Sequence, residues 1–469
     1  MTGSPVLDGE VDVAVIGAGV VGSAIARDLA GTHLSVAVLE ARNDVGDGTS
    51  KANTGILHTG FDAKPGTLES RLVARGYDLL RDYADATGIP IETTGALLVA
   101  WTQEELDTLP SLRDKAVANG YDRCELVDAA SVYARVPALA PGALRGLTVP
   151  DESITCTWTA TLALATDAVR RGARLLRDHP VTGASPDPRG GWLLETPHGL
   201  VRARWVVNAA GLGADQVDRL TGHDRFTVTP RRGELFVFDK LARPMVPVIV
   251  LPVPSKVGKG VLVSPTIYGN VMLGPTAEDL DDKTMTATSE EGFAFLLDKG
   301  ARLMPTLLEE EVTATYAGLR AAIDADDYLI DLDAARRYVL VGGIRSTGLT
   351  ASMAIAQHVV GLLASGSDLD LSPRTELPDP PRMPNLGEAG LRPYQDPELI
   401  AADPDYGRVV CFCERVTAGE LRDALASTIP PADLDGLRRR TRVMNGRCQG
   451  FFCGANTRVL LEARGEEAR

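Results

Sequence analysis

Short runs of apolar residues, separated by glycines, dominate the first 40 positions of the chain. Val11 and the run Val13 to Ile16 have the character of a buried strand, and Val36 to Leu39 form a second apolar run. Between them, the stretch that continues past Gly22 has the composition of a helix. Buried parallel strands are nearly continuous in apolar residues and are joined by helices. The pattern therefore predicts a strand–helix–strand unit of a parallel sheet.

The turn between the first strand and the helix carries Gly17, Gly19 and Gly22. Gly17 allows a tight turn, Gly19 lets a pyrophosphate approach the backbone, and Gly22 lets helix and strand pack closely. The helix N-terminus offers N–H groups and a positive dipole end to the pyrophosphate. Glu40 follows the second strand, close to the ~20-residue offset at which an acid hydrogen-bonds a ribose hydroxyl. These features predict a dinucleotide site. The alternative is a glycine-rich turn in some other parallel sheet.

Small and hydroxylated residues dominate the segment from Thr49 to Gly55. Such residues are expected where the backbone passes close to a bulky ligand. His58 follows directly after this segment. A single histidine is more often a hydrogen-bonded surface or core residue, but this position favours a role beside the cofactor.

Apolar and polar patterns predict further elements up to residue 225. We expect helices at 66–83 and 155–175, a peripheral helical region at 104–141, strands at 97–100 and near Val181, a hairpin turn at 187–191, and a strand at 205–208 that runs into Ala210 and Gly211. A second strand running into small residues suits a two-part flavin-binding domain. The sequence contains no second GxGxxG motif with a following acid. We therefore assign the single dinucleotide site to FAD and expect an electron acceptor other than NAD(P).

The pattern changes to alternating strands between Thr227 and Leu332. We expect strands at 233–238, 260–264, 271–273 and 314–320, with one helix, as an antiparallel sheet that covers the flavin and forms the substrate pocket. Arg320 stands at a strand end, where it could hold an anionic substrate group. The alternative for Arg320 is a surface ion pair with Asp324 or Asp326. Lys256 and Lys259 are expected at the surface.

Another buried strand, Tyr338 to Gly342, is followed by glycines, Thr347 and a long apolar helix that starts near Thr350. The N-terminus of this helix can face the flavin and stabilise negative charge on the reduced ring. This strand returns the chain to the first domain, so the flavin domain is expected to be discontinuous.

Charge and the termini narrow the class of protein. The chain has 469 residues and a formal net charge of -15, which argues against nucleic acid or anionic lipid as a partner. The N-terminus lacks the basic and apolar regions of a signal peptide, and no uncharged apolar run reaches the ~18 residues of a spanning helix. We expect a cytoplasmic protein with no transmembrane segment, and the inner face of the membrane is the second location considered.

A proline-rich stretch, residues 366–408, leads to a cysteine-rich end. We interpret the stretch as a partly extended linker. Four of the six cysteines form a CxC pair and a CxxxxC pair, Cys411, Cys413, Cys448 and Cys453. Four thiolates can hold a [2Fe–2S] cluster or zinc, or the grouping can be fortuitous. A flavin on the same chain favours iron–sulfur, because FAD can pass on its two electrons one at a time.

Two further motifs lie between the cysteine pairs. Thr417 and Glu420 have the spacing of a capping box that opens a helix. The basic run Arg438 to Arg442 is either a solvated helix face, a counter-charge for the cluster, or a docking surface for a partner.

Several segments carry a family resemblance: GAGVVG, KANTGILHTGFDAKPGTLESRL, PRRGELFVFD, VLVSPTIYGNVMLGPTAED, YAGLR and GGIRSTGLTAS. Together they resemble the D-amino-acid-oxidase (DAO) superfamily, and within it the glycerol-3-phosphate dehydrogenases and oxidases and the L-2-hydroxyglutarate dehydrogenases. The tail, from VVCFCERVTAGEL to RRRTRVMNGRCQGFFC, is similar to the BFD-like [2Fe–2S] module of anaerobic glycerol-3-phosphate dehydrogenases.

The resemblance implies roles for individual residues. It implies His58 as the base beside the flavin, Arg320 and Arg345 as anion-holding residues, and the four cysteines of the tail as cluster ligands. The residues expected to contact FAD are Gly17, Ala18, Gly19, Val20, Val21, Gly22, Glu40, Ala41, Arg42, Thr49, Ser50, Ala52, Asn53, Thr54, Gly55, Leu57, Val181, Ala210, Gly211, Gly343, Gly348, Leu349 and Thr350.

The expected fold is α/β (α+β), with a Rossmann-like FAD domain (11–225 and 333–365), an antiparallel-sheet substrate domain (226–332), a linker (366–408) and a helical [2Fe–2S] module (409–469). The expected activity is oxidation of a small anionic secondary alcohol, foremost sn-glycerol 3-phosphate, with electrons leaving through the cluster to a quinone, a partner subunit or a carrier. The alternatives are oxidation of L-2-hydroxyglutarate, another 2-hydroxy acid, or an amine. From other classes, the chain could be an electron-transfer or iron-delivery protein, or an inactive flavoprotein with a zinc-binding interaction module.

Overall fold

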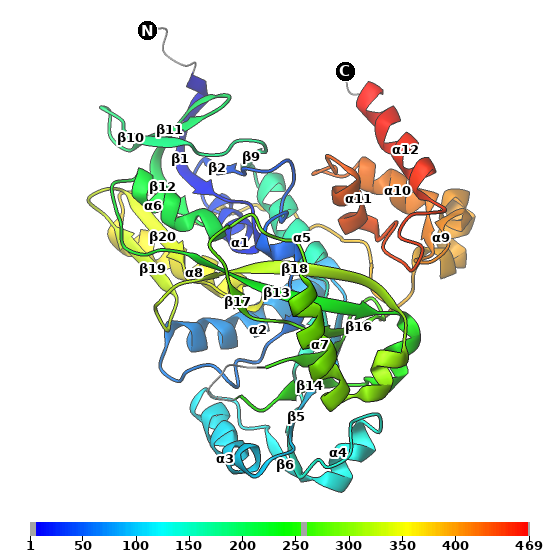
Figure 1. Cartoon of the computed structure of the whole chain (residues 1–469). Coiled ribbons are helices and arrows are strands. Elements are labelled where there is room, and N and C mark those ends of the chain that lie inside the picture. Colours follow the sequence, from blue (N-terminus) through cyan, green and yellow to red (C-terminus); the bar gives the residue numbers. More distant parts are fainter. Residues whose placement is uncertain (1–5, 255–259, 468–469) are drawn as a thin grey trace.

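The computed structural model describes residues 6–254 and 260–467. Two large sheets with their covering helices form the main body, and a small helical module at the C-terminal end packs against one side (Figure 1). The expected mixture of helices and sheets, with a small helical C-terminal unit, is confirmed.

The first sheet contains the predicted strand–helix–strand unit. Its central strands β9, β2, β1, β12 and β20 are parallel, and β10, β11 and β19 add antiparallel pairs at its edges. The bounds are β1 Val6–Ile16, β2 Val36–Leu39, β9 Arg174–Leu176, β10 Gly183–Pro186, β11 Trp192–Thr196, β12 Gly199–Asn208, β19 Leu329–Asp333 and β20 Tyr338–Gly342. The prediction of a strand near Val181 is wrong, because this residue lies between the end of β9 and the start of β10. The turn predicted at 187–191 joins β10 to β11.

Helices α1, α2, α5 and α8 pack together in the main core of this part. Their bounds are α1 Val20–Ala30, α2 Leu68–Thr87, α5 Thr157–Arg170 and α8 Gly348–Gly366, and the short α6 Ala214–Leu220 contacts β20. α8 contacts both α1 and α2, and buried residues along it belong to the same apolar cluster. By length and composition alone α8 could cross a membrane, but 61% of its apolar window is buried inside the protein. Core packing therefore accounts for the apolar character of α8.

The second sheet corrects one expectation from the sequence. Besides strands from the 226–332 region, it contains β5, β6 and β7, which the sequence patterns placed with the FAD domain. The bounds are β5 Ala96–Ala100, β6 Glu125–Asp128, β7 Arg145–Val149, β13 Thr229–Phe238, β14 Ile249–Pro252, β15 Leu262–Pro265, β16 Val271–Gly274, β17 Glu278–Asp279 and β18 Val312–Ala322. The pairing is antiparallel except between β14 and β5.

The helices α3 Gln103–Ala118, α4 Ala129–Arg135 and α7 Glu290–Leu303 accompany this second sheet. The region expected to be helical, 104–141, therefore also supplies a strand, β6, because its residues pair with β7. A small third sheet joins β3 Ile56–Leu57, β8 Ser153–Thr155 and β4 Ile91–Thr93, and so connects the segment before His58 to the start of α5.

The stretch 366–408 follows the surface of both sheets with little regular structure. Pro373 forms a bridge with Thr32, the Met383 N–H donates to Thr87, and the Glu388 N–H donates to Ile267. A short helix, α9 Pro397–Ala402, precedes the C-terminal unit.

The C-terminal unit, residues 409–467, is called the cysteine module below. It contains β21 Val409–Cys411, β22 Val416–Thr417, α10 Ala418–Leu425, α11 Leu434–Thr441 and α12 Gly454–Glu467. The predicted capping box is present, since Thr417 Oγ1 accepts from the Glu420 N–H and the Glu420 carboxylate accepts from the Thr417 N–H.

Candidate functional site

Most of the residues expected to contact FAD lie at one edge of the first sheet. The parallel strands β1, β2, β12 and β20 end at Ile16, Leu39, Asn208 and Gly342, and each is followed within two residues by such residues. In open α/β sheets, ligands bind outside the carboxyl ends of the strands. The architecture therefore brings the four segments to one place.

The glycine turn requires glycine at two of its positions. Gly17 has a φ of +102°, and a Cβ there would lie 2.6 Å from the Ala209 carbonyl oxygen. A Cβ on Gly22 would lie 2.0 Å from the Gly17 carbonyl oxygen, which is far inside contact distance. A Cβ on Gly19 would meet only the Ser50 hydroxyl, at 3.2 Å. The backbone around the turn thus has the close packing that the dinucleotide motif needs.

Glu40 faces the glycine turn. Its carboxylate accepts hydrogen bonds from the Ala18 N–H at 2.7 Å and the Arg42 N–H at 2.9 Å. Burial raises the pKa of this carboxyl above its ordinary value, although the two N–H groups oppose the shift. The segment that leads to Val181 runs alongside, because the His179 N–H donates to the Glu40 carbonyl.

The segment after Gly48 lies between the first helix and the second sheet. Ser50 Oγ accepts from the Val20 N–H at the start of α1, and Thr49 Oγ1 donates to the Leu319 carbonyl on β18. Ala52 also packs closely against β18, because a Cβ added to Gly318 of that strand would lie 2.1 Å from the Ala52 carbonyl oxygen. The predicted cofactor segment therefore occupies the junction of the two sheets.

The N-terminus of α8 adjoins both the glycine turn and His58. A Cβ on Gly348 would lie 3.7 Å from Val21, and Thr350 Oγ1 accepts from the His58 N–H at 3.0 Å. Gly343, with a φ of +68°, leads the chain into this helix. These contacts place the expected residues of the last segment beside those of the first.

His58 has a partner that the sequence did not suggest. Its Nδ1 lies 3.0 Å from Oε2 of Glu152, whose side chain is fully buried. The other carboxylate oxygen of Glu152 accepts from the N–H and the hydroxyl of Thr59, at 2.7 and 2.9 Å. No local pattern marks Glu152, because its partners lie more than 90 residues away along the chain.

Arg320 lies inside the second sheet and not in the alternative surface pair. Its guanidinium donates to the Thr276 carbonyl at 2.7 Å, and in the described part of the chain no carboxylate lies within ion-pair distance of it. Burial, reinforced by the neighbouring Arg231, lowers the pKa of Arg320 to about 10. A half-buried cation with no carboxylate within ion-pair distance is suited to an anionic ligand. Within residues 6–254 and 260–467, no hydrogen bond joins Arg320 to His58.

Arg345 is less available than Arg320 to an anionic ligand. It pairs with Glu69 at 2.5 Å and donates to the Asp326 carbonyl at 3.0 Å. The same Glu69 carboxylate accepts from Thr347. An anionic substrate group would compete with Glu69 for Arg345. Lys256 and Lys259 lie outside the described residues.

A cavity of about 660 Å³ lies where the FAD-binding part, the second sheet and the cysteine module meet. Six of the expected FAD contacts line it: Arg42, Thr49, Ala52, Asn53, Thr54 and Gly55. β18 lines one side, and Asn445 and Gln449, next to the second cysteine pair, line another. Its volume is in the range of cofactor and ligand sites. The cofactor segment and a cysteine-bearing loop therefore border the same space.

The four cysteines come together in two pairs. Cys413 contacts Cys448, and Cys453 contacts Cys411. Burial and the neighbouring Cys411 raise the pKa of Cys453 to about 11, whereas the N–H of Phe452 lowers the pKa of Cys448. Among the described residues, no group of three or more ligands is arranged for a single metal ion. Backbone N–H groups are directed at Cys448 in one pair and at Cys453 in the other, as suits thiolates that bind a metal centre.

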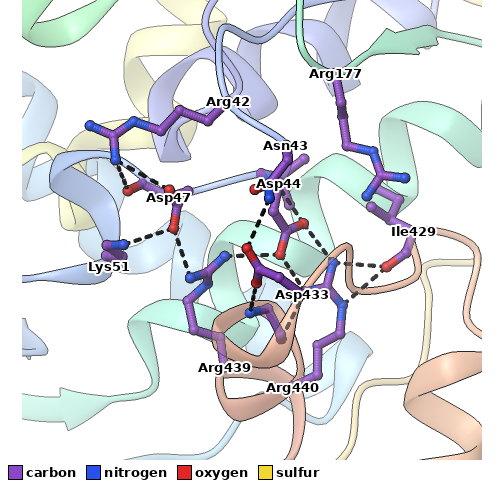
Figure 2. A network of polar contacts seen from close by, with 12 residues as sticks. Arg42, Asn43, Asp44, Asp47, Lys51, Arg177, Ile429, Asp433, Arg439 and Arg440 are labelled. Carbon is purple, nitrogen blue, oxygen red and sulfur yellow. Dashed lines mark hydrogen bonds and ion pairs between the residues drawn. The ribbon is translucent and has the colours of Figure 1, made fainter. Parts of the chain in front are cut away.

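The basic run is not a solvated helix face. Arg439, Arg440 and Arg442 are buried, and the first two bind the FAD-binding part of the same chain (Figure 2). Arg440 forms a bidentate pair with the fully buried Asp44, at 2.7 and 2.8 Å, and also donates to the Ile429 carbonyl. Asp44 lies only four residues beyond Glu40.

Further contacts extend this junction. Arg439 bonds Asp44 at 2.9 Å and Asp47 at 2.8 Å, and Asn43 donates to Asp433 at 2.8 Å (Figure 2). Asp47 also accepts from Lys51 and Arg42. The cysteine module is thereby fastened to the segment that runs from Arg42 to Lys51, which includes predicted FAD contacts.

Arg442 fastens the module to the second sheet. Its guanidinium lies 4.0 Å from the centre of the Tyr268 ring, in the loop between β15 and β16, and is held there by Glu414 of the module itself at 2.8 Å. Tyr268 in turn stacks on Trp158, with ring centres 5.2 Å apart. The module therefore has buried arginine anchors on both large parts of the protein, Arg439 and Arg440 on the FAD-binding part and Arg442 on the loop before β16.

Comparison with known proteins agrees with these two parts. Residues 12–362 match the DAO family model, described as FAD dependent oxidoreductase, and residues 409–463 match the BFD-like [2Fe-2S] binding domain. A glycerol 3-phosphate dehydrogenase of Caloramator mitchellensis is 34% identical over 452 residues, which cover 96% of this chain and 93% of that protein. One subunit of the anaerobic glycerol-3-phosphate dehydrogenase of Escherichia coli K12 is 27% identical, covering 96% of this chain and 88% of that protein.

A solved structure shows the same fold with its cofactor in place. The L-alpha-glycerophosphate oxidase of Mycoplasma pneumoniae, with FAD bound, matches with a TM-score of 0.75 and 28% identity, covering 80% of this chain and 99% of that one. FAD and a [2Fe–2S] cluster are therefore the cofactors, while the individual contacts of the 23 expected residues with FAD stay a prediction. The chain belongs to the FAD-dependent oxidoreductases of the DAO family and carries a BFD-like [2Fe–2S] domain.

Proposed function

We propose that the protein oxidises sn-glycerol 3-phosphate to dihydroxyacetone phosphate and passes the electrons through its cluster to a separate acceptor. The observation that carries the proposal is the similarity to a glycerol 3-phosphate dehydrogenase over 452 residues, which includes both the FAD-binding part and the cysteine module. The alternatives from the same superfamily, 2-hydroxy acids and amines, lack a relative of that identity and coverage among those described above.

In this proposal each site residue has a distinct task. FAD supplies a two-electron acceptor for the hydride of the carbinol carbon. His58 takes the hydroxyl proton, a role in which a positioned base contributes ~10²–10⁴ in rate. Arg320 holds the phosphate, since it is a half-buried cation with no carboxylate within ion-pair distance in the described part of the chain. Arg345 assists only when it exchanges Glu69 for the substrate.

The cysteine module holds the cluster through Cys411, Cys413, Cys448 and Cys453. Its arginine anchors fix it beside the predicted cofactor segment, so that electrons travel a fixed path within one chain. Phe412, Phe451 and Phe452, which flank the cysteines, are 73%, 85% and 72% exposed. Exposed aromatic residues next to the cluster ligands support a protein as the immediate electron acceptor.

We further propose that this acceptor is a partner subunit or carrier that delivers electrons to a quinone. The relative from Escherichia coli is named as one subunit of an anaerobic enzyme, which supports a multi-subunit assembly for this chain. In such an assembly the protein works in the cytoplasm, and any membrane contact is made by the partner.

The proposal is tested by anaerobic reduction of the purified holoenzyme. sn-Glycerol 3-phosphate should bleach the flavin absorbance, whereas L-2-hydroxyglutarate, lactate, sarcosine and L-proline should not. His58→Ala should retain FAD yet lose at least ~100-fold in the rate of bleaching. Reduction by a 2-hydroxy acid or an amine in place of glycerol 3-phosphate would replace the proposed substrate, and undiminished bleaching in His58→Ala would remove His58 from the mechanism.

A further inference from the structure

Glu152 is a buried carboxylate whose surroundings are unusual for a purely structural acid. Its side chain is fully buried, and its two oxygens accept from the Thr59 N–H, the Thr59 hydroxyl and His58 Nδ1. Among the described residues, no lysine or arginine lies within ion-pair distance of Glu152, and His58 is its only basic partner. Burying a carboxylate without such donors is costly, so the hydrogen bonds must be kept.

The contacts determine which ring nitrogen of His58 carries hydrogen. A carboxylate oxygen only accepts, so Nδ1 must be the donor across the 3.0 Å contact. In the neutral ring the lone pair then resides on Nε2. The backbone of His58 is held independently, because its N–H donates to Thr350 at the start of α8. The ring and its peptide are therefore fixed from two different elements.

We propose that Glu152 is a positioning residue for His58: it holds the imidazole in the tautomer whose Nε2 accepts the substrate hydroxyl proton, and it stabilises the imidazolium that results. This role rests on the proposed function, in which His58 is the base. The proton passes from the substrate oxygen to Nε2, the hydride goes to the flavin, and the Nδ1 hydrogen stays with Glu152, whose carboxylate is not protonated.

A structural role alone predicts something different. Glu152 also ties two loops together, since its own carbonyl accepts from the Gly95 N–H and its carboxylate holds Thr59. If that were its whole contribution, any side chain that preserved the Thr59 bonds would preserve activity. The test must therefore keep the Thr59 contacts and change only what faces His58.

Glu152→Gln does this. With its oxygen retained by Thr59, the amide NH₂ faces His58 Nδ1, which must then accept, so that hydrogen moves to Nε2. We expect the rate of flavin reduction to fall roughly 10²–10⁴-fold with little change in KM and with FAD content unchanged. Glu152→Asp, which keeps a carboxylate, should recover part of the rate. Asp151→Asn is the matched control, because this neighbouring acid bonds Tyr121 and Arg123 and not His58.

A second readout does not depend on the substrate. In protein labelled with ¹⁵N-histidine, with the His58 signals identified from His58→Gln, the wild type should show hydrogen on Nδ1 and Glu152→Gln should show it on Nε2. If glycerol 3-phosphate fails to reduce the wild type, the proposed function falls while the tautomer measurement still decides the role of Glu152. Hydrogen on Nε2 in the wild type would overturn the proposal, as would equal rates in Glu152→Gln and the wild type.

Discussion

The core around α1 and α8 and the interior of the cysteine module differ in size and in residue composition. The first is a large apolar cluster that includes Ile25, Leu29 and Ile355, and it draws residues from helices and strands across the FAD-binding part. The second is a small cluster that includes Cys411 and Cys453, two of the expected cluster ligands. The module is then held to the rest of the protein by buried arginines, Arg439 and Arg440 on Asp44 and Arg442 on the Tyr268 ring. The difference indicates that the FAD-binding part is stabilised by packing, whereas the module depends on its cluster and on polar anchors.

The largest effect is expected from the thiols. Cys411→Ser should abolish the [2Fe–2S] absorbance and leave the module open to proteases, because it removes both an expected ligand and a buried core residue. The FAD-binding part should keep its flavin. The ratio of flavin to iron in the purified variant, together with limited proteolysis, measures both. A variant that kept full iron content would mean that Cys411 is not a ligand.

The next effect concerns the polar anchor. Asp44→Ala leaves Arg440 buried without a carboxylate and Arg439 with Asp47 alone, and breaking a buried pair in this way typically costs about 3–5 kcal/mol. Hydrogen exchange over residues 409–467 should accelerate, while exchange in α1 and α8 stays slow. Uniform acceleration across the chain would contradict independent anchoring of the module.

A smaller effect is expected from packing in the FAD-binding part. Gly22→Ala places a methyl group 2.0 Å from the Gly17 carbonyl, so the backbone must shift, at a cost of about 1–3 kcal/mol and a loss of FAD affinity. Gly361→Ala, in α8, is the control, since a Cβ there meets nothing within 4 Å. FAD dissociation followed by fluorescence compares the two. Equal affinities would show that the turn tolerates a side chain.

Acidic pH should weaken the docking of the cysteine module on the rest of the protein by a modest amount. Burial works to raise the pKa of Glu414, but Arg442 and Lys240 outweigh it and hold that pKa below its usual 4.5. A lowered pKa stabilises the folded state above the unfolded value and loses that contribution as the pH falls through the folded value. Docking should therefore be constant from about pH 6 to 8 and weaken below about pH 4.5. Small-angle scattering would detect the expansion, and a compact particle down to pH 3 would contradict it.

The smallest loss of stability is expected at the exposed edge of the contact between the cysteine module and residues 42–51. Arg42 is 47% exposed and pairs with Asp47 at 3.2 Å, so Arg42→Gln should cost at most about 1 kcal/mol. In this variant the rate of hydrogen exchange in the cysteine module should match that of the wild type. A loss of stability as large as that of Asp44→Ala would show that the exposed Arg42–Asp47 pair contributes as much as the buried Arg440–Asp44 pair.

The sequence predicted what depends on local pattern. Apolar runs located β1, β2 and β20, the glycine spacing located the turn beside them, and the Thr417–Glu420 spacing located the start of α10. Contacts between distant segments gave no such signal. Asp44 and Arg440 are 396 residues apart, and only folding shows that they meet.

The same reason explains the other differences. β5, β6 and β7 join the second sheet because their edges pair there, which no periodicity within residues 96–149 reveals. Glu152 lacks any motif, and its importance follows from its place beside His58. Arg345 had a family role by resemblance, but its pairing with Glu69 appears only in three dimensions.

The central claim is that one chain takes two electrons from glycerol 3-phosphate onto FAD and passes them singly to its own cluster. An anaerobic titration followed by visible and electron paramagnetic resonance spectra tests this most directly. FAD accepts two electrons and a [2Fe–2S] cluster one, so about 1.5 equivalents of substrate should fully reduce the protein, with the signal of the reduced cluster appearing. An end point at about one equivalent with the cluster still oxidised, or no bleaching at all, would contradict the account.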